Sequence, residues 1–344
     1  MIKKISCGVV IYDEIADIKR LTTWLINELR DYSPQWIFVL NHEQPEIRHW
    51  IKAWMLENFK DSICIENPSN NLGYARQLIL ETATEDLVYM TDPDVEIKPG
   101  GLIKLIELAR TEDLINLDAK TIGFGGLLIY RSNNLFLQKT FDFIFLVAEK
   151  IPFSFQIQHH SHLSVVDHIP SCHLLLKRKL ALEIGGFSHQ FDHVGEDLEF
   201  SHRAYTKGLQ FIFSPKAAAY HSQNLTFAQW LYRVFTFGQV QVTVQKLHYR
   251  RGLRYYRLLP VLILFLLCLF SIFFFNLTLI LISLSILIGF LVPGFLGFLL
   301  TALTYSLGEF AEMIYPVLEI KNATQLQEEK LNLETLVQRS KIGS

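Results

Sequence analysis

The stretch Leu87-Val-Tyr-Met-Thr-Asp-Pro-Asp-Val-Glu96 joins a short apolar run to a cluster of acidic residues. It is the last of four short apolar runs in the first hundred residues, the others being 5–11, 36–40 and 62–65. Between these runs, apolar residues recur at helical spacing over 16–30, 45–59 and 73–83. This β-α-β-α order predicts an α/β fold with a mostly parallel sheet and helices on both faces.

Polar side chains follow the four apolar runs. In a parallel sheet, ligands bind beyond the carboxyl ends of the strands. The residues at those positions are Tyr12, Asp13, Asn41, Glu66, Asn67, Asp92 and Asp94. This series suits a nucleotide, and we expect Asp13, Asn41 and Asp92 to contact it. No GxGxxG motif follows the first run, which argues against a dinucleotide-binding dehydrogenase.

The pair Asp92 and Asp94 has a second implication. Two carboxylates one residue apart on an extended segment can approach the same divalent cation and a diphosphate from one edge. Oxygen ligands of this kind suit Mg²⁺ or Mn²⁺. An Asp-x-Asp pair is also common in solvated turns, so the pattern by itself leaves both interpretations open.

A second acidic pair, Glu196 and Asp197, follows the segment Gly185-Gly186-Phe187. The sequence predicts helices over 178–184 and 195–207, and strands over 121–130 and 210–213. Carboxylates in the first turn of a helix often serve only as partners of the helix dipole. That structural role stands as the alternative to a chemical one.

Taken in order, these motifs resemble those of glycosyltransferase family 2, whose members have a GT-A (Rossmann-like) fold. The resemblance covers residues 5–222. Besides the two acidic pairs, it includes Asn71-x-Gly73-x-x-Arg76 and Pro215-x-x-x-x-Tyr220-His221. It implies a metal-dependent, usually inverting enzyme that uses a nucleotide sugar.

The resemblance also implies roles for individual residues. Asp92 and Asp94 correspond to the pair that binds metal and donor, and His221 to a histidine that completes the metal site, with Mn²⁺ or Mg²⁺ as the cofactor. Asp197 corresponds to the general base, with Glu196 beside it in an acceptor or supporting role. The expected donor-site residues are Asn71, Gly73 and Arg76, although the arginine could simply pair with an acid.

Three sequence features differ from the motifs of the family or have no counterpart among them. Ser171-Cys172-His173 replaces the small residues that many members have before a Met-Leu-x-Arg segment. Gln229, Trp230 and Arg233 lack the spacing of the processive Gln-x-x-Arg-Trp motif, so we do not predict polymerisation. The His159–His162 run lacks zinc-site spacing and a cysteine partner, and we interpret it as a mobile loop near the acceptor.

The chain contains no charged residue or histidine from Leu258 to Gly308. This length predicts about two membrane spans, 258–275 and 277–300, as a C-terminal transmembrane hairpin, with a third short span left open. Basic residues flank the stretch and place the catalytic domain on the cytoplasmic side. Aromatic and basic residues over 225–257 predict amphipathic helices at the membrane interface, or alternatively a helix packed on the catalytic domain.

The predicted domains are therefore a catalytic domain (1–224), interface helices (225–257), membrane helices (258–308) and a cytoplasmic tail (309–344). We expect a sugar transferase of the inner (cytoplasmic) membrane that acts on a polyprenyl-linked or envelope-glycan acceptor. A polyprenyl-phosphate sugar synthase is one alternative, and a non-catalytic membrane scaffold with a degenerate fold is another. The four separated cysteines indicate a reducing compartment, and the net charge of −2 gives no sign of nucleic-acid binding.

Overall fold

The computed structural model describes residues 3–12, 15–59, 61–115, 120–148, 162–248, 266 and 294–314. The chain forms two compact units. The first contains Met1–Ile129 and His160–His221, and the second contains Tyr130–His159 and Ser222–Ile320. Residues 130–148, which the sequence assigned to the catalytic domain, belong to the second unit.

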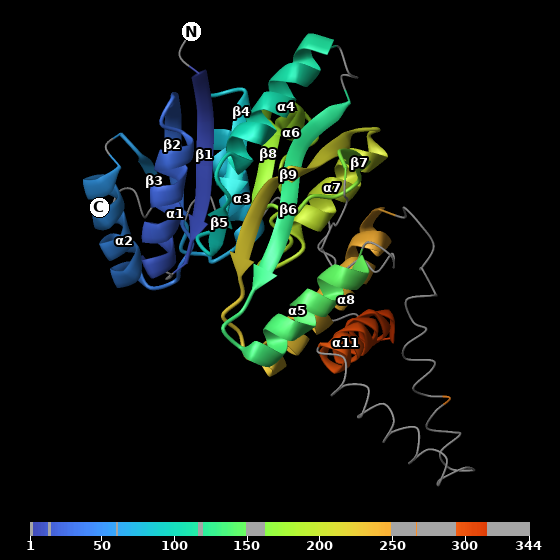
Figure 1. Ribbon diagram of the computed structural model, residues 1–344. Helices are drawn as coiled ribbons and strands as arrows, with labels where there is room; N and C mark the ends of the chain where they lie inside the picture. Colours follow the sequence, from blue (N-terminus) through green and yellow to red (C-terminus); the bar gives the residue numbers. More distant parts are fainter. Residues whose placement is uncertain are drawn as a thin grey trace. The chain divides into compact units, whose positions relative to one another are not determined.

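Four parallel strands form one half of the sheet in the first unit (Figure 1). Their order is β3 (Ile63–Glu66), β2 (Tyr32–Leu40), β1 (Lys3–Ile11) and β4 (Leu87–Thr91). They are connected by α1 (Ile15–Glu28), α2 (Pro45–Asn58) and α3 (Leu72–Thr82). The predicted strand and helix order of the first ninety residues is confirmed, with bounds within a few residues.

The other half of the sheet contains antiparallel pairs, so the sheet is mixed rather than mostly parallel as predicted. Beyond β4 the strand order continues with β8 (His173–Lys177), β6 (Thr121–Arg131), β9 (Gln210–Ser222) and β5 (Val95–Ile97), and β7 (Ser164–Val166) pairs with β9. The pairs β4–β8, β6–β8, β5–β9 and β7–β9 are antiparallel. Parallel pairing needs a crossover of a dozen or more residues, usually helical. The regular strand–helix alternation that supplies such crossovers stops after β4.

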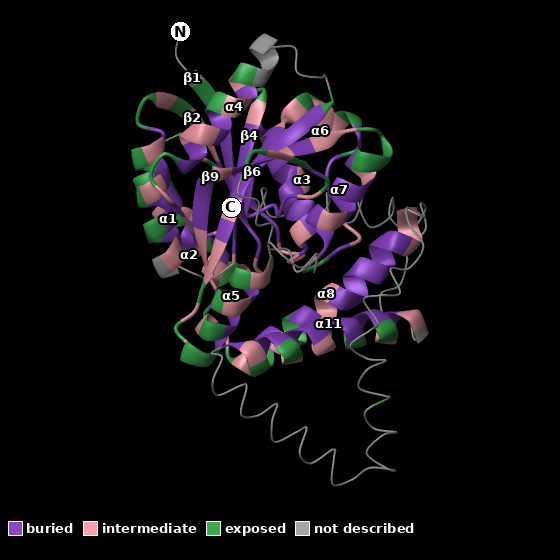
Figure 2. Ribbon diagram, turned by 45° about the vertical axis from the view of Figure 1, so that its right-hand side comes forward, coloured by how far each residue is buried: buried purple, intermediate pink, exposed green. Residues whose placement is uncertain are grey.

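Helices cover both faces of the sheet, as predicted. Alternate β1 residues (Ile5, Cys7, Val9 and Ile11) pack with apolar residues of α1, α2 and α4 (Gly101–Ile115). Val10 belongs to the opposite core, formed with α3, α6 (Arg178–Glu183) and α7 (Glu196–Thr206). Figure 2 shows the strands as largely buried, with exposed residues on the outer sides of α1 and α2. Successive side chains of β1 point to opposite faces of the sheet, so this strand contributes to two separate cores.

Strand register brings the predicted functional segments together. Thr91 at the end of β4 pairs with His173 at the start of β8, so Asp92 leaves the sheet beside Ser171 and Cys172. Val95 in β5 pairs with His221 in β9, which sets the Asp94 segment beside that histidine. Segments that are far apart in the sequence therefore meet at one edge of the sheet.

The second unit contains α5 (Leu135–Ala148), α8 (Phe227–His248) and α11 (Phe295–Ile314). Its core joins Leu137 and Phe141 of α5, Trp230 and Val234 of α8, and Tyr305 of α11. Within the part of the chain that the structure describes, no helix is long and apolar enough to cross a bilayer. The predicted span 258–275 lies outside the described residues apart from Leu266, and so does the predicted span 277–300 up to residue 293, whereas residues 295–300 belong to α11. Helix α11 continues across residues 308 and 309, where we predicted the boundary between the membrane helices and the cytoplasmic tail.

Candidate active site

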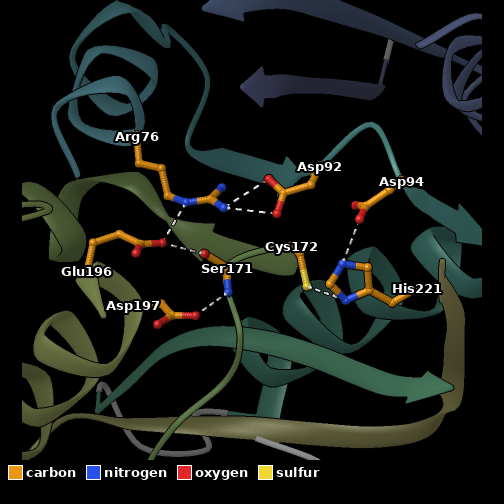
Figure 3. A network of polar contacts seen from close by, with 8 residues as sticks. All are labelled: Arg76, Asp92, Asp94, Ser171, Cys172, Glu196, Asp197 and His221. Carbon is orange, nitrogen blue, oxygen red and sulfur yellow. Dashed lines mark hydrogen bonds and ion pairs between the residues drawn. The ribbon is translucent and has the colours of Figure 1, made fainter. Parts of the chain in front are cut away.

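Arg76 of α3 joins two acidic segments from opposite sides of the site (Figure 3). Its Nη2 donates to both carboxylate oxygens of Asp92, at 2.9 and 3.2 Å, and its Nε donates to Oε1 of Glu196 at 3.0 Å. The Arg76 side chain is only 2% exposed and that of Glu196 only 3%. The guanidinium therefore pairs with one carboxylate directly after β4 and with another at the start of α7.

Ser171 holds the second acidic pair. Its hydroxyl donates to Glu196 Oε1 at 3.0 Å, and its backbone N–H donates to Asp197 Oδ2 at 3.2 Å. The other Asp197 oxygen accepts from the backbone N–H of Leu198 at 2.7 Å. Ser171 thus orients both carboxylates (Figure 3), and the first turn of α7 adds a second donor to Asp197.

Burial changes the acidity of this pair. Burial and the neighbouring Asp197 raise the pKa of Glu196 to about 7, against the opposing effect of Arg76. Burial also raises the pKa of Asp197, and the N–H groups of Ser171 and Leu198 together with Arg76 oppose this rise. Two carboxyl groups with raised pKa values in a polar site are typical of acid–base chemistry.

Asp94 faces His221 rather than Arg76. Its Oδ2 lies 3.1 Å from Nε2 of His221, and Cys172 Sγ lies 4.0 Å from Nδ1 of the same ring. Burial lowers the pKa of His221, but the nearby Asp94 and Cys172 outweigh it and hold this pKa well above its usual value. The imidazole and the carboxylate therefore contact each other directly (Figure 3).

The side chains around Asp94 supply some of the ligands that a divalent cation needs. One carboxylate and one imidazole, with the Asp94 side chain 30% exposed, match the ligand preference of Mn²⁺. No group of three or more His, Cys, Asp or Glu side chains among the described residues could hold a metal. Asp92, predicted as a further ligand, directs its carboxylate to Arg76. Asp94 and His221 would thus be two ligands of a bound cation, which would take its remaining ligands from substrate oxygens and water.

Asn41 lies where the sequence predicted it, at the carboxyl end of β2. It is fully buried, and its Oδ1 accepts from Asn67 Nδ2 at 2.6 Å. It also lowers the pKa of the neighbouring Tyr12, which burial and Asp92 raise more strongly. Asp13, the other predicted nucleotide contact of this region, lies outside the described residues.

Asn71 and Gly73 contact a loop of the protein itself. Asn71 caps α3 by accepting from Tyr74 N at 2.7 Å and donates to the carbonyl of His189 at 2.8 Å. A Cβ at Gly73 would collide with the carbonyl oxygen of Ser188. In the structure these two predicted donor-site residues hold the 188–192 loop close to α3.

Two residues near the site were not predicted to take part in it. Ser171 was singled out only as a departure from the family pattern, although it binds both members of the acidic pair. His173 has a structural role, because its ring contacts the Tyr89 hydroxyl at 2.7 Å and the Ala217 carbonyl at 3.1 Å. Burial lowers the pKa of His173 to about 4, so the ring is neutral near pH 7. Of the His159–His162 run, only His162 lies within the described residues.

Two family models match the sequence. The model described as "Glycosyl transferase family 2" matches residues 6–182, just over half of the 344 residues. The model described as "Glycosyl transferase family group 2" matches residues 141–304. A search of curated protein sequences found no match.

Solved structures with a similar fold include two glycosyltransferases. The first is the mannosyltransferase PcManGT from Pyrobaculum calidifontis in complex with GDP-Man and Mn²⁺, with a TM-score of 0.63 and 14% identity over 92% of this chain and 88% of that one. The second is GalNAc-T7 with UDP, GalNAc and Mn²⁺, with a TM-score of 0.50 and 11% identity over 74% of this chain and 56% of that one. At these identities the likeness shows the GT-A type fold.

Proposed function

The chain belongs to glycosyl transferase family 2, and on this premise we propose that it moves a sugar from a nucleotide diphosphate donor onto a membrane-associated acceptor with the help of a divalent cation. It is a glycosyltransferase by family and by fold. The observation that carries the proposal is the meeting of the Asp94–His221 pair with the Glu196–Asp197 pair at one edge of the sheet (Figure 3).

On the donor side, Asp94 and His221 would hold Mn²⁺ or Mg²⁺. Such a cation neutralises negative charge on the departing diphosphate. The Asp92–Arg76 ion pair lies beside Asp94, and Asn41 lies directly after β2. Two structural neighbours were solved with Mn²⁺ and with a nucleotide or nucleotide sugar, which supports the same chemistry here.

On the acceptor side, Asp197 is the better general base of the two carboxylates. Glu196 is tied to the Arg76 guanidinium and the Ser171 hydroxyl and is 2% exposed, whereas Asp197 accepts only from backbone N–H groups and is 8% exposed. A carboxylate held in this way can take the proton from an acceptor hydroxyl. Attack from the face opposite the diphosphate would invert the anomeric carbon.

The proposed acceptor is lipid-linked or part of an envelope glycan, at the cytoplasmic face of the inner membrane. Sequence supports this part of the proposal, because residues 258–308 carry no charge and basic residues such as Arg250, Arg251 and Arg254 precede them. An acceptor near the membrane would bring its hydroxyl to an enzyme held at the same surface.

Nucleotide release tests the function. The full-length protein with Mn²⁺ should release nucleotide from one of a panel of UDP-, GDP- and dTDP-sugars, slowly to water and faster with a polyprenyl-linked acceptor. Chelation of the cation should stop the release, and Asp94→Asn should resemble the chelated enzyme. If no donor binds or reacts, the protein is a non-catalytic member of the family.

The same assay separates the two classes of acceptor. A hydroxyl acceptor must lose a proton during transfer, but a polyprenyl phosphate is already ionised near neutral pH. Asp197→Asn should therefore slow transfer to a hydroxyl and largely spare transfer to a phosphate. Faster turnover with polyprenyl phosphate than with any glycan acceptor would replace our proposed acceptor by the lipid phosphate.

A further inference from the structure

Helix α11 has an inverted distribution of polar and apolar residues. Its most exposed large side chains are Leu296, Leu299, Leu307 and Phe310, which are 37–41% exposed. Its only two charged residues, Glu309 and Glu312, are 5% and 1% exposed. A helix at the water surface of a globular protein shows the opposite arrangement.

The exposed residues lie on one face of the helix. Leu296, Leu299, Leu303, Leu307 and Phe310 follow one another at intervals of three or four residues, which is the spacing of a single helical stripe. Leu303 is partly exposed and the other four are exposed. We call these five residues the apolar stripe of α11. It contains no polar side chain along about four turns.

The opposite face of α11 carries polar contacts to α8. Glu312 Oε1 accepts from the Thr243 hydroxyl at 3.1 Å and lies 3.6 Å from Lys246 Nζ. Lys246 Nζ also donates to the Glu312 backbone carbonyl at 2.8 Å. Ionisable residues inside membranes face the protein interior and are paired there. The carboxylate of Glu312 has this placement.

Small residues bring the two helices close together. A Cβ at Gly308 would collide with the carbonyl of Phe235, and a Cβ at Gly238 with the carbonyl of Tyr305. The Trp230 indole N–H donates to the Thr301 hydroxyl at 3.2 Å within the same helix pair. Glycines at the contact and interhelical hydrogen bonds are typical of helix packing in lipid.

We propose that the apolar stripe of α11 contacts the acyl chains of a lipid bilayer. Bilayer lipid is favoured over another occupant because the uncharged stretch that begins at Leu258 extends to Gly308, so residues 295–308 of α11 are its last part. The inference adds a defined lipid-contacting surface to the membrane association in the proposed function, on which it rests.

Site-specific quenching tests the stripe. Leu299→Cys and Leu307→Cys would each be labelled with the fluorophore NBD in full-length protein in phosphatidylcholine vesicles. The background would carry Cys64→Ser and Cys268→Ser, because Cys7 and Cys172 are buried. Leu56→Cys on α2, 49% exposed in the wild type and next to Glu57, is the matched control.

We expect doxyl-labelled lipid to quench the probes at 299 and 307 at least twofold more than aqueous iodide does, and the reverse at 56. Iodide quenching at 299 and 307 would place the stripe in water. Quenching by neither agent would mean that protein covers it, and either result would overturn the inference. The readout needs no catalysis, so failure of the donor assay with lipid quenching intact would refute the proposed reaction and leave the lipid-contacting surface standing.

Discussion

Replacing Arg76 by glutamine should cost more than any other single change in the site. The guanidinium binds Asp92 and Glu196, and the Arg76 and Glu196 side chains are 2% and 3% exposed, so solvent cannot replace the lost charge. Removing one partner of a buried ion pair costs about 3–5 kcal/mol. The loss should be greater at pH 8 than at pH 6, because at pH 6 the buried Glu196 can take up a proton instead.

Urea unfolding at both pH values measures this effect. Adding Glu196→Gln to Arg76→Gln should recover much of the loss at pH 8, because it removes the uncompensated charge. Arg203→Gln is the matched control, since Arg203 binds the Glu199 carboxylate and two backbone carbonyls away from the site. The control should lose stability at both pH values and keep its donor affinity. A loss below about 1 kcal/mol for Arg76→Gln, or no recovery in the double variant, would refute the assigned role of the guanidinium.

Three further predictions concern the same unit. Asp94→Ala should abolish the Mn²⁺ dependence of donor binding in calorimetry and His221→Ala should weaken it less, whereas equal donor affinity with and without metal in the wild type would contradict both. The pKa of Glu196 is about 7 in the folded protein against 4.5 in the unfolded chain, so the folded state holds more protons between these values and stability falls as pH rises through that window. At about 1.4 kcal/mol per pH unit the fall is roughly 3 kcal/mol, and it should be smaller in Glu196→Gln; an unchanged pH profile in that variant would contradict the assignment. Gly73→Ala gains up to ~1 kcal/mol of helix propensity but forces a Cβ against the Ser188 carbonyl at a cost of about 1–3 kcal/mol, so its melting temperature should fall, and a rise would show that the loop yields.

Local sequence patterns predicted the first half of the sheet well. Apolar runs of four to seven residues alternate with amphipathic segments up to Thr91, and each run became a strand, although β2 begins four residues before its run. Local patterns are enough to predict this part of the fold, because each strand is followed in the sequence by the helix that covers it. The same reasoning correctly gave the strand at 121–130 and the helices at 178–184 and 195–207.

In the other half of the sheet, β5, β7 and β9 were harder to predict because they lack that local signal. β5 and β7 have three residues each, which is too short for periodicity to appear. β9 was predicted only over 210–213, since Pro215 and the alanines at 217–219 interrupt the apolar pattern, yet the strand continues to Ser222. Pairing with β5 and β7, rather than its own sequence, stabilises this strand.

The contacts within the site also depend on residues that are distant in the sequence, so local patterns did not predict them. The resemblance to the family named the two acidic pairs, Arg76 and His221, but it did not say which of them touch. The contacts of Arg76 with Glu196 and of Asp94 with His221 join residues more than a hundred positions apart, and the second depends on the register of β5 and β9. Ser171 was missed as a site residue because one of its two contacts uses the backbone N–H, which any residue type could supply.

The most direct test of the account measures donor affinity and transfer rate on the same Asp197→Asn variant. The asparagine keeps the shape of the side chain and loses its basic site, and the Asp94–His221 pair is untouched. Calorimetry should therefore give nearly wild-type affinity for the nucleotide sugar, while transfer to a hydroxyl acceptor falls about 10²–10⁴-fold. If Asp197 merely stabilises the start of α7, the variant should lose about 0.3–1 kcal/mol of stability and transfer at almost the wild-type rate, which would contradict its assignment as the base.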